Sequence, residues 1–401
     1  MKKRVSISTV IVLIALAAVL TFQMTFVSVS KKYEKALDEL SIQLNTYSKL
    51  AEVDAIYRSM YIGEIDEENI SDMIIHGYVA GTGDKYAYYM NRHQFAESMS
   101  DISADMVGIG VLVIYSDLGI EIINVMPDSP ALEAGILPGD LLVYVGGESV
   151  SELGYNGALA KMLGEEGTVA EFTVLRNGEL IDFAITRAHV TEMSVMHRVY
   201  EPDPTVGVIR LLEFDFGTPA QLMEAYDKLT AAGVTRIVFD VRYNSGGELE
   251  SVCEILDFLL PEGPIIHIED ANGNRETIYS DEKHADIPMA VLVNGSTASA
   301  AELFACALQD YGVAELVGTV TYGKGTMQRL LSLSDGSGLA VSYRMYMPPY
   351  SECYEGVGVT PDYLCEIDEA LLSKNIYKIS DAEDNQLSKA VEVLNGNNNA
   401  A

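Results

Sequence analysis

The sequence predicts an α/β core with a largely parallel sheet, preceded by a small, partly open β-barrel with two helices and, at the N-terminus, by a transmembrane helix and a helical segment. Three observations predict this arrangement. The second half of the chain alternates short apolar runs with amphipathic helical segments. The middle of the chain contains several short strands separated by turn residues. The first thirty residues contain one long apolar run.

The N-terminal run predicts a single membrane-spanning helix. Residues 2–4 are basic, and the stretch from Val5 to Val29 is apolar except for a few Ser, Thr and Gln residues before Lys31. About 20 apolar residues span a bilayer, and no small-residue cleavage site follows this run, so we expect an uncleaved anchor. The basic end favours the cytoplasm, which places the rest of the chain outside it, attached to the cell membrane in a single pass. Residues 1–30 are assigned to a cytoplasmic stub and this anchor.

A helical region is expected next, over residues 31–94. Apolar residues recur at steps of three and four, from Leu37 through Leu44 to Met60. Turn residues from Gly81 to Tyr86 end the pattern. Such a segment serves as a spacer or as the contact of a homodimer.

The small barrel is assigned to residues 95–188. A Ser-Pro pair at Ser129 predicts the N-cap and first residue of a helix that runs to Ala134, and a second helix is expected over Asn156–Leu163. Asn177 followed by glycine, between two apolar runs, is a strong hairpin signal. The predicted strands are Gly110–Tyr115, Ile120–Val125, Leu141–Val145, Val169–Arg176 and Leu180–Thr186.

The α/β core is assigned to residues 189–380. Buried-type strands are each followed by a loop and a helix, which favours parallel strands with helices packed on the sheet. The expected strands are Val206–Arg210, Arg236–Arg242 and Met289–Val293, and the expected helices are Thr218–Ala232, Glu248–Leu260 and Ser299–Asp310. Residues 381–401 are assigned to a final helix, Asp384–Leu394, and an Asn-rich tail.

The composition excludes some classes of function. Acidic residues outnumber basic ones 59 to 26, a formal net charge of −33, and such a surface repels the phosphate backbone of nucleic acids. The four cysteines have no C-x-x-C spacing and no histidine nearby, so a zinc site is not expected, and no metal or organic cofactor is implied. The interval between Cys353 and Cys365 would allow a disulfide outside the cytoplasm, and the sequence leaves this open.

One strand-to-helix loop, Asp240–Gly247, contains two adjacent glycines. Sites in α/β folds form where strands end and loops lead into helices. Paired glycines allow backbone N–H groups to turn toward one point, which suits an anion or a developing oxyanion. A tight turn that needs positive φ is the simpler explanation of this loop taken alone.

A second loop, Val291–Glu302, contains Ser299 among small residues at the expected start of a helix. A hydroxyl at this position lies beside free backbone donors and the positive end of the helix dipole, which helps an alkoxide to form. The alternative is that a serine of this loop simply caps the helix, and Ser296 is the candidate for that role.

A third loop, Gly318–Gln328, contains Lys324 between two glycines. A lysine that loses solvation has a lowered pKa, so that neutral amine becomes available as a base. The loop does not fit a nucleotide-binding loop, because Gly325 stands where Ser or Thr would ligate magnesium. Most lysines are solvated surface residues, so Lys324 alone is a weak signal. The six histidines are scattered outside these loops, and nothing points to a Ser–His–Asp triad.

With these loops the chain resembles the carboxy-terminal processing peptidases, also called tail-specific proteases. The resemblance covers nearly everything after the anchor and is carried by segments in the family's order, at residues 83–89, 107–110, 129–140, 240–247, 294–302, 323–328 and 355–362. The segments at residues 107–110 and 129–140 resemble a PDZ domain, which corresponds to the small barrel.

The resemblance implies a serine endopeptidase that captures polypeptide C-termini through its PDZ domain and hydrolyses a nearby peptide bond through an acyl-enzyme. Ser299 is then the nucleophile, Lys324 the general base, and Gln328 the residue that orients the lysine. The oxyanion donors implied are backbone N–H groups of Gly246 or Gly247 and of Ala300. The peptide-binding residues implied are Gly108, Ile109, Gly110 and Val111, beside which the substrate adds as a strand.

The sequence departs from the family pattern in places. Ser245 replaces a proline before the glycines, and Cys306 replaces a frequent glycine seven residues after Ser299, but the implied catalytic residues are retained. Arg176, at the end of a barrel strand, is a candidate for coupling peptide binding to the catalytic loops, with a solvated hairpin arginine as the alternative. Two other functions stay open: a PDZ scaffold with an inactive peptidase core, and an acyl-transfer enzyme acting on a small thioester.

Overall fold

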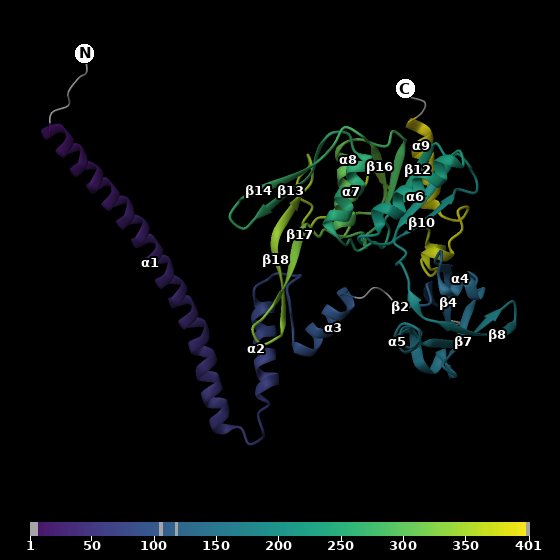
Figure 1. Cartoon of the computed structure of the whole chain (residues 1–401), viewed down its shortest axis with the longest axis horizontal. Helices are drawn as coiled ribbons and strands as arrows, with labels where there is room; N and C mark the ends of the chain where they lie inside the picture. The colour runs from purple at the N-terminus through teal and green to yellow at the C-terminus, as the bar shows by residue number, and fades with distance from the viewer. Residues whose placement is uncertain (1–6, 104–106, 117–118, 398–401) are drawn as a thin grey trace, which may run out of the picture. The chain divides into compact units, whose positions relative to one another are not determined.

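The computed structural model describes residues 7–103, 107–116 and 119–397, and the chain divides into two compact units, residues 1–73 and 74–401 (Figure 1). The first unit consists of α1 (Ile7–Met60) and the first part of α2 (Glu67–Gly81). Arg58 donates to Asp54 in α1 and to Glu67 at the start of α2, at 2.8 and 2.7 Å, and so ties the two helices together. No helix within the described ranges combines the length and the apolar character needed to cross a membrane. The basic residues 2–4 lie outside the described residues.

A six-stranded sheet forms the centre of the second unit. Its order is β10-β11-β12-β15-β16-β19, and every neighbouring pair is parallel except the edge pair of β10 with β11. This confirms the expected, largely parallel sheet. The strands are β10 (Val195–Val199), β11 (Val206–Leu211), β12 (Arg236–Asp240), β15 (Met289–Val293), β16 (Ala314–Gly318) and β19 (Tyr363–Leu364).

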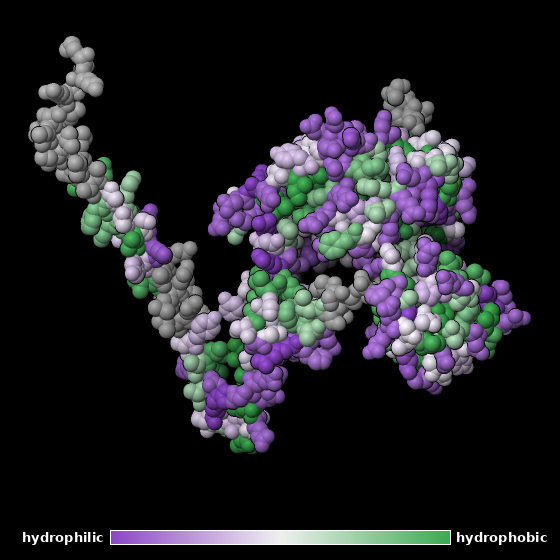
Figure 2. Space-filling model, viewed as in Figure 1, coloured by the Kyte–Doolittle hydropathy of each residue, from purple (hydrophilic) through white to green (hydrophobic). Residues whose placement is uncertain are grey.

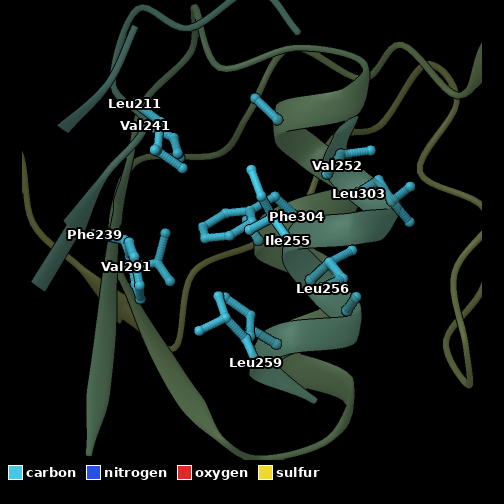
Figure 3. Close-up of a cluster of buried hydrophobic side chains, with 14 of the residues drawn as sticks. Leu211, Phe239, Val241, Val252, Ile255, Leu256, Leu259, Val291, Leu303 and Phe304 are labelled. Carbon is cyan, nitrogen blue, oxygen red and sulfur yellow. The ribbon is translucent and has the colours of Figure 1, made fainter. Parts of the chain in front are cut away.

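Helices bury both faces of this sheet, because successive side chains of a strand point to opposite faces. On one face Phe239 and Val291 point toward Phe304, which is fully buried and meets the Phe239 ring edge-on at 5.4 Å (Figure 3). Truncation of such a phenylalanine to alanine costs about 3–5 kcal/mol. On the other face Val238 and Leu292 pack in the same cluster as residues of the C-terminal helix. The helices are α6 (Thr218–Ala231), α7 (Leu249–Leu259) and α8 (Ala300–Asp310) on the first face, and α9 (Asn385–Asn397) on the second.

A second sheet of five strands was not expected from the sequence. In it β18 pairs with β1, β13 and β17, all antiparallel, and β13 also pairs with β14. The strands are β1 (Tyr88–Met90), β13 (Gly263–Asp270), β14 (Arg275–Ser280), β17 (Thr326–Ser332) and β18 (Gly338–Met347). Strand β1 belongs to the stretch expected to be helical. The chain therefore contributes to the core before it enters the barrel, as well as after it.

The barrel contains the strands β3 (Val111–Ser116), β4 (Gly119–Val125), β5 (Leu141–Val145), β7 (Val169–Arg176) and β8 (Glu179–Thr186), in the order β3-β4-β5-β7-β8, with β6 (Glu148–Ser149) beside β5. Two predictions are confirmed. Ser129 caps α4 (Pro130–Ala134) by accepting from the backbone N–H of Leu132 at 3.2 Å. Asn177 and the glycine after it both have positive φ in the β7–β8 turn. The second helix, α5 (Val150–Met162), begins earlier than expected and is kinked at Gly154.

A short antiparallel pair joins the barrel to the core. Strand β2 (Val107–Gly108) leads into the barrel, β9 (Ala188–His189) leads out of it, and the two pair residue for residue. The entry and exit of the barrel are therefore adjacent, as they are in a domain inserted into another.

The structure also shows the surroundings of the cysteines and of His267. All four cysteines are free thiols, so Cys353 and Cys365 do not form the disulfide that their spacing allowed. His267 lies in β13, where its ring nitrogens contact Thr277 Oγ1 at 2.7 Å and Pro349 O at 3.3 Å, so this histidine is held by hydrogen bonds within the second sheet. Hydrophilic side chains cover much of the visible face of the second unit, as the net charge leads one to expect (Figure 2).

Candidate active site

The loop after β12 places Gly246 against the start of α8 and Gly247 against Phe214. Gly246 and Gly247 have φ values of 107° and 135°, which side chains rarely allow. A methyl group on Gly246 would lie 2.9 Å from Ala300 N and from Ser299 Cβ, so only glycine fits between the two loops. Gly246 therefore serves both the turn and the close approach to Ser299, whereas Gly247 lies against the backbone of Phe214.

The backbone donors of this region divide into occupied and free ones. The N–H of Gly246 donates to Asn244 Oδ1 at 2.8 Å, and Asn244 in turn donates through Nδ2 to Leu211 O at 2.9 Å. In the part of the chain that the structure describes, the N–H groups of Gly247 and Ala300 have no hydrogen-bond partner. Of the two glycines predicted as donors, Gly247 is thus the one available to a ligand, together with Ala300.

Ser299 occupies the N-cap position of α8 with a strained backbone. Its φ of 57° and ψ of −120° lie outside the conformations that a serine normally adopts, and its side chain is largely buried. The cap is therefore Ser299, whereas the sequence had suggested Ser296, whose N–H instead donates to Asn294 Oδ1 at 3.1 Å. The hydroxyl of Ser299 stands at the N-terminus of an eleven-residue helix, where the dipole favours negative charge.

The carboxylate of Glu302 joins the serine loop to the lysine loop. It is completely buried, and its Oε2 accepts from the backbone N–H groups of Ser299 at 2.9 Å and of Lys324 at 2.8 Å. Its Oε1 accepts from the N–H of Gly323 at 2.7 Å and from the Thr321 hydroxyl. Because two N–H groups share one oxygen, the backbone nitrogens of Ser299 and Lys324 are at most about 6 Å apart. Two residues that are 25 positions apart in the sequence are thereby brought into one site.

Lys324 is half-buried between Gln328 and Tyr86. Its Nζ donates to Gln328 Oε1 at 2.8 Å and lies 5.3 Å from the centre of the Tyr86 ring. Burial lowers the pKa of Lys324, and the negative charges of Glu355 and Glu302 oppose this. Among the described side chains there is no hydrogen bond between Lys324 Nζ and Ser299 Oγ.

A buried ion network supports the glycine loop from behind. Arg242 donates to Asp240 at 2.9 and 2.8 Å and to Asp384 at 3.2 and 2.7 Å, and its side chain is almost completely buried. Arg210 donates to the same Asp240, at 3.0 Å through Nε. Neighbouring arginines hold the pKa of Asp240 far below its usual range, although burial opposes them. Asp384 immediately precedes α9, so the C-terminal helix helps to position the end of β12.

The residues predicted to bind a peptide lie at the start of the β3 edge. Ile109 is buried, and its carbonyl accepts from Ala131 N at 2.9 Å, while the Gly110 carbonyl accepts from Met126 N at 3.0 Å. Gly110 has a φ of 78° and no room for a side chain, because a methyl group would lie 2.3 Å from Ser129 Cβ. Gly108 pairs with Ala188 in the strand pair that joins barrel and core, and Val111 is the first residue of β3.

Arg176 contacts other residues of the barrel. Its guanidinium donates to the buried Asp140 at 2.6 Å twice and to Gly135 O at 2.9 Å, and its charge lies 6.0 Å from the Phe183 ring centre. The pair lowers the pKa of Asp140, against the effect of burial. These contacts stabilise the barrel, and a coupling role for Arg176 stays a prediction.

A carboxylate cluster flanks Phe214, whose N–H donates to Gly246 O in the glycine loop at 2.9 Å. Oxygen atoms of Glu192, Glu213 and Asp215 all lie within 4.8 Å of one another. Burial, together with repulsion from the other two, raises the pKa of Glu213 to about 7. Proton uptake by Glu213 relieves this repulsion, so the cluster needs no cation.

Sequence reasoning did not assign roles to four residues that the structure places at the site: Glu302, Asn244, Asp384 and Tyr86. A signal existed for Glu302, because a serine followed three residues later by glutamate is the pattern of a capping box. Asp384 and Tyr86 have no local signal, since each reaches the site from a distant part of the chain.

Taken together, the three loops bring a serine hydroxyl, a lysine with a lowered pKa and two free N–H groups into one region. This is the equipment of acyl transfer: a nucleophile, a base and donors for a tetrahedral oxyanion.

Comparisons with known proteins agree with this chemistry. A model of peptidase family S41 matches residues 205–365, and a model of the PDZ domain matches residues 121–176. The carboxy-terminal processing protease CtpA of Bacillus subtilis is 31% identical over 324 residues, 80% of this chain and 69% of the relative. The chloroplastic carboxyl-terminal-processing peptidase 2 of Arabidopsis thaliana is 34% identical over 306 residues, which are 73% of this chain but 59% of that protein.

One solved structure supports the fold alone. A crystal structure of an S41 protease from Bacteroides fragilis aligns with a TM-score of 0.54 at 17% identity, covering 85% of this chain and 94% of that one.

Proposed function

The chain belongs to the carboxyl-terminal-processing serine peptidases of family S41, and we propose that it hydrolyses peptide bonds of polypeptide substrates through an acyl-enzyme on Ser299. The observation that carries this mechanism is the Glu302 carboxylate, whose one oxygen binds the backbone of both Ser299 and Lys324. A backbone hydrogen bond from Tyr322 N–H to Thr297 O, at 3.0 Å, joins the same two loops.

In the proposed reaction, neutral Lys324 removes the proton of the Ser299 hydroxyl as its oxygen attacks the substrate carbonyl carbon. The tetrahedral oxyanion accepts from the N–H groups of Gly247 and Ala300. The Lys324 ammonium then protonates the leaving amine, and the acyl group stays on Ser299. Neutral Lys324 then takes a proton from water as the water oxygen attacks the acyl carbon. The bond to Ser299 Oγ breaks, the lysine returns the proton to that oxygen, and the carboxylic acid product ionises.

Gln328 has the role of orienting the base. A neutral amine that donates to Gln328 Oε1 keeps its lone pair for the Ser299 hydroxyl proton. Because Ser299 and Lys324 are not hydrogen-bonded in the structure, a rotation of their side chains into contact is part of the proposal.

The PDZ domain is proposed to bind the free C-terminus of the substrate. Strand β3 is the last strand of its sheet, so an extended peptide can add to its open edge by main-chain hydrogen bonds. The loop of Gly108, Ile109 and Gly110 leads directly into β3 and would hold the terminal carboxylate.

Cleavage of an unfolded polypeptide tests the catalytic proposal. The full chain in detergent should degrade reduced, carboxymethylated casein, and S299A and K324A should each reduce the rate at least 100-fold while folding normally. Undiminished cleavage by S299A would contradict the mechanism. Binding of casein without any cleavage by the unmodified chain would support the scaffold alternative.

A matched pair of peptides tests recognition of the C-terminus. A peptide with a free terminal carboxylate should be cleaved with a lower KM than the same peptide with a terminal amide. Equal KM values would show that the PDZ domain does not read the carboxylate.

Anchoring and self-association are proposed from the N-terminal segment. The apolar run from Val5 to Val29 supports a single-pass anchor that places the peptidase outside the cytoplasm. Exposed apolar side chains of α1, among them Val53 and Ile56, support a homodimer contact. The full chain should resist extraction from membranes by carbonate, whereas a chain without residues 1–30 should be released; release of both would refute the anchor. The sedimentation rates of the two chains measure whether each of them forms a homodimer.

A further inference from the structure

Residues 82–90 dock onto the catalytic lysine although they precede the PDZ domain in the chain. Asp84 fixes this segment by accepting from both the N–H and the hydroxyl of Ser342 in β18, each at 2.9 Å. Strand β1 continues the docking through its pairing with β18, and Tyr89 is buried. The segment is therefore a fixed part of the core.

Tyr86 is the residue of this segment that meets the catalytic loop. Its ring centre lies 5.3 Å from Lys324 Nζ, within the range of a cation–π contact. Its hydroxyl donates to the Gly323 carbonyl at 3.3 Å, and its own carbonyl accepts from Gln328 Nε2 at 3.5 Å. One residue thus contacts the lysine, the residue before it and the glutamine that binds its amine.

The phenol remains neutral at any pH at which the enzyme would work. Burial, with a contribution from the charge of Glu355, raises the pKa of Tyr86 to about 12. Tyr86 therefore neither takes the serine proton nor pairs with Lys324 as an anion. What it supplies is an apolar ring on one side of the amine and two hydrogen bonds to the loop.

We propose that Tyr86 is a positioning residue for Lys324: its ring excludes water from one side of the amine while its hydrogen bonds hold Gly323 and Gln328 in place. This inference rests on the proposed role of Lys324 as general base. It adds that the catalytic centre is completed by a residue that precedes the PDZ domain in the chain.

The charged and titratable groups around the amine determine what a change at Tyr86 does. Glu302 and Glu355 face Lys324 and raise its pKa, while burial lowers it. Removal of the ring admits water and weakens the lowering effect. The pKa of Lys324 then rises, and the rising limb of activity moves to higher pH with it. At a fixed pH below that limb, each unit of increase in the pKa reduces the neutral amine about tenfold.

The test is the pH dependence of kcat/KM for casein peptides with the full chain and three variants. Y86A should move the rising limb to higher pH by one unit or more and should lower kcat more than it raises KM. Y86F keeps the ring and should stay within about threefold of the unmodified enzyme. Y86L keeps the apolar cover without the π-face, so its limb should stay at or below the original pH. Y88A, a change at an exposed tyrosine of β1, is the matched control and should change neither limb nor kcat.

Thermal unfolding of each variant separates loss of fold from loss of positioning, and Y86L preserves the packing volume if Y86A is unstable. A Y86A profile that superimposes on that of the unmodified enzyme would overturn the inference, as would equal upward shifts for Y86A and Y86L. Failure of the unmodified chain to cleave at all would instead overturn the proposed function.

Discussion

Replacement of Glu302 by glutamine removes the acceptor that the serine and lysine loops share. The carboxylate accepts four hydrogen bonds, two on each oxygen. A glutamine can accept only on its carbonyl oxygen, so its NH₂ group faces two donors that lose their partners. Each buried donor left unsatisfied costs about 1–3 kcal/mol, which gives a loss of about 2–6 kcal/mol in the free energy of unfolding.

The same change alters the pKa of Lys324, the proposed base. Glu302 raises the pKa of Lys324, so removal of its charge lowers that pKa, and the rising limb of kcat/KM should move to lower pH in the molecules that remain folded. The rate at the plateau should nevertheless fall, because in either orientation of the amide a backbone N–H of the lysine loop, that of Gly323 or of Lys324, loses its acceptor.

Glu355 provides the matched control for E302Q. It also raises the pKa of Lys324, but it accepts from the N–H of Gly325 and, among the described residues, makes no hydrogen bond to the serine loop. E355Q should therefore move the limb to lower pH with a smaller loss of stability. Urea unfolding and pH–rate profiles of both variants measure the two effects. An E302Q variant that unfolds at the same urea concentration as the unmodified chain and keeps its plateau rate would refute the reasoning.

Three further predictions follow from the same contacts. D384N leaves Arg242 with fewer buried acceptors and should lower the free energy of unfolding by about 3–5 kcal/mol, as measured in urea; an unchanged midpoint would contradict the network. G246A places a methyl group 2.9 Å from Ser299 Cβ and should reduce kcat at least about 100-fold in the casein assay, and a normal rate would show that the two loops are free to separate. E213Q should raise the melting temperature at pH 8 but not at pH 4: the raised pKa of Glu213, about 7, gives stability that is complete below its unfolded value and is lost as pH rises through 7, so equal differences at both pH values would count against it.

Local signals were sufficient for the parallel sheet and for most of the barrel. Buried strands such as Met289–Val293 are continuous apolar runs, and turn residues such as Asn177 have one suitable conformation, so both could be read from a few neighbouring residues. The segments of Ser299 and Lys324 were also found, because glycines and small residues surround them. The structure then added the relation between the loops.

The second sheet and the supports of the site were not predictable in the same way. Strand β1 has three residues and pairs with a strand about 250 positions later, and no local pattern encodes that pairing. The choice between the two glycines depended on Asn244, whose side chain occupies the Gly246 N–H. The contacts of Tyr86 and Asp384 likewise depend on how distant segments pack. The local periodicity of apolar residues contains no information about that packing.

The adjacent β2 and β9 strands have a consequence for how such an enzyme diversifies. A domain whose first and last residues lie side by side can be exchanged for another domain whose termini are equally close. The rest of the chain then keeps its length and its path. The PDZ domain of this chain is in that sense an exchangeable unit. Residues 82–90 and the segments after β9 must instead be inherited together, since each half of the peptidase fold is incomplete without the other.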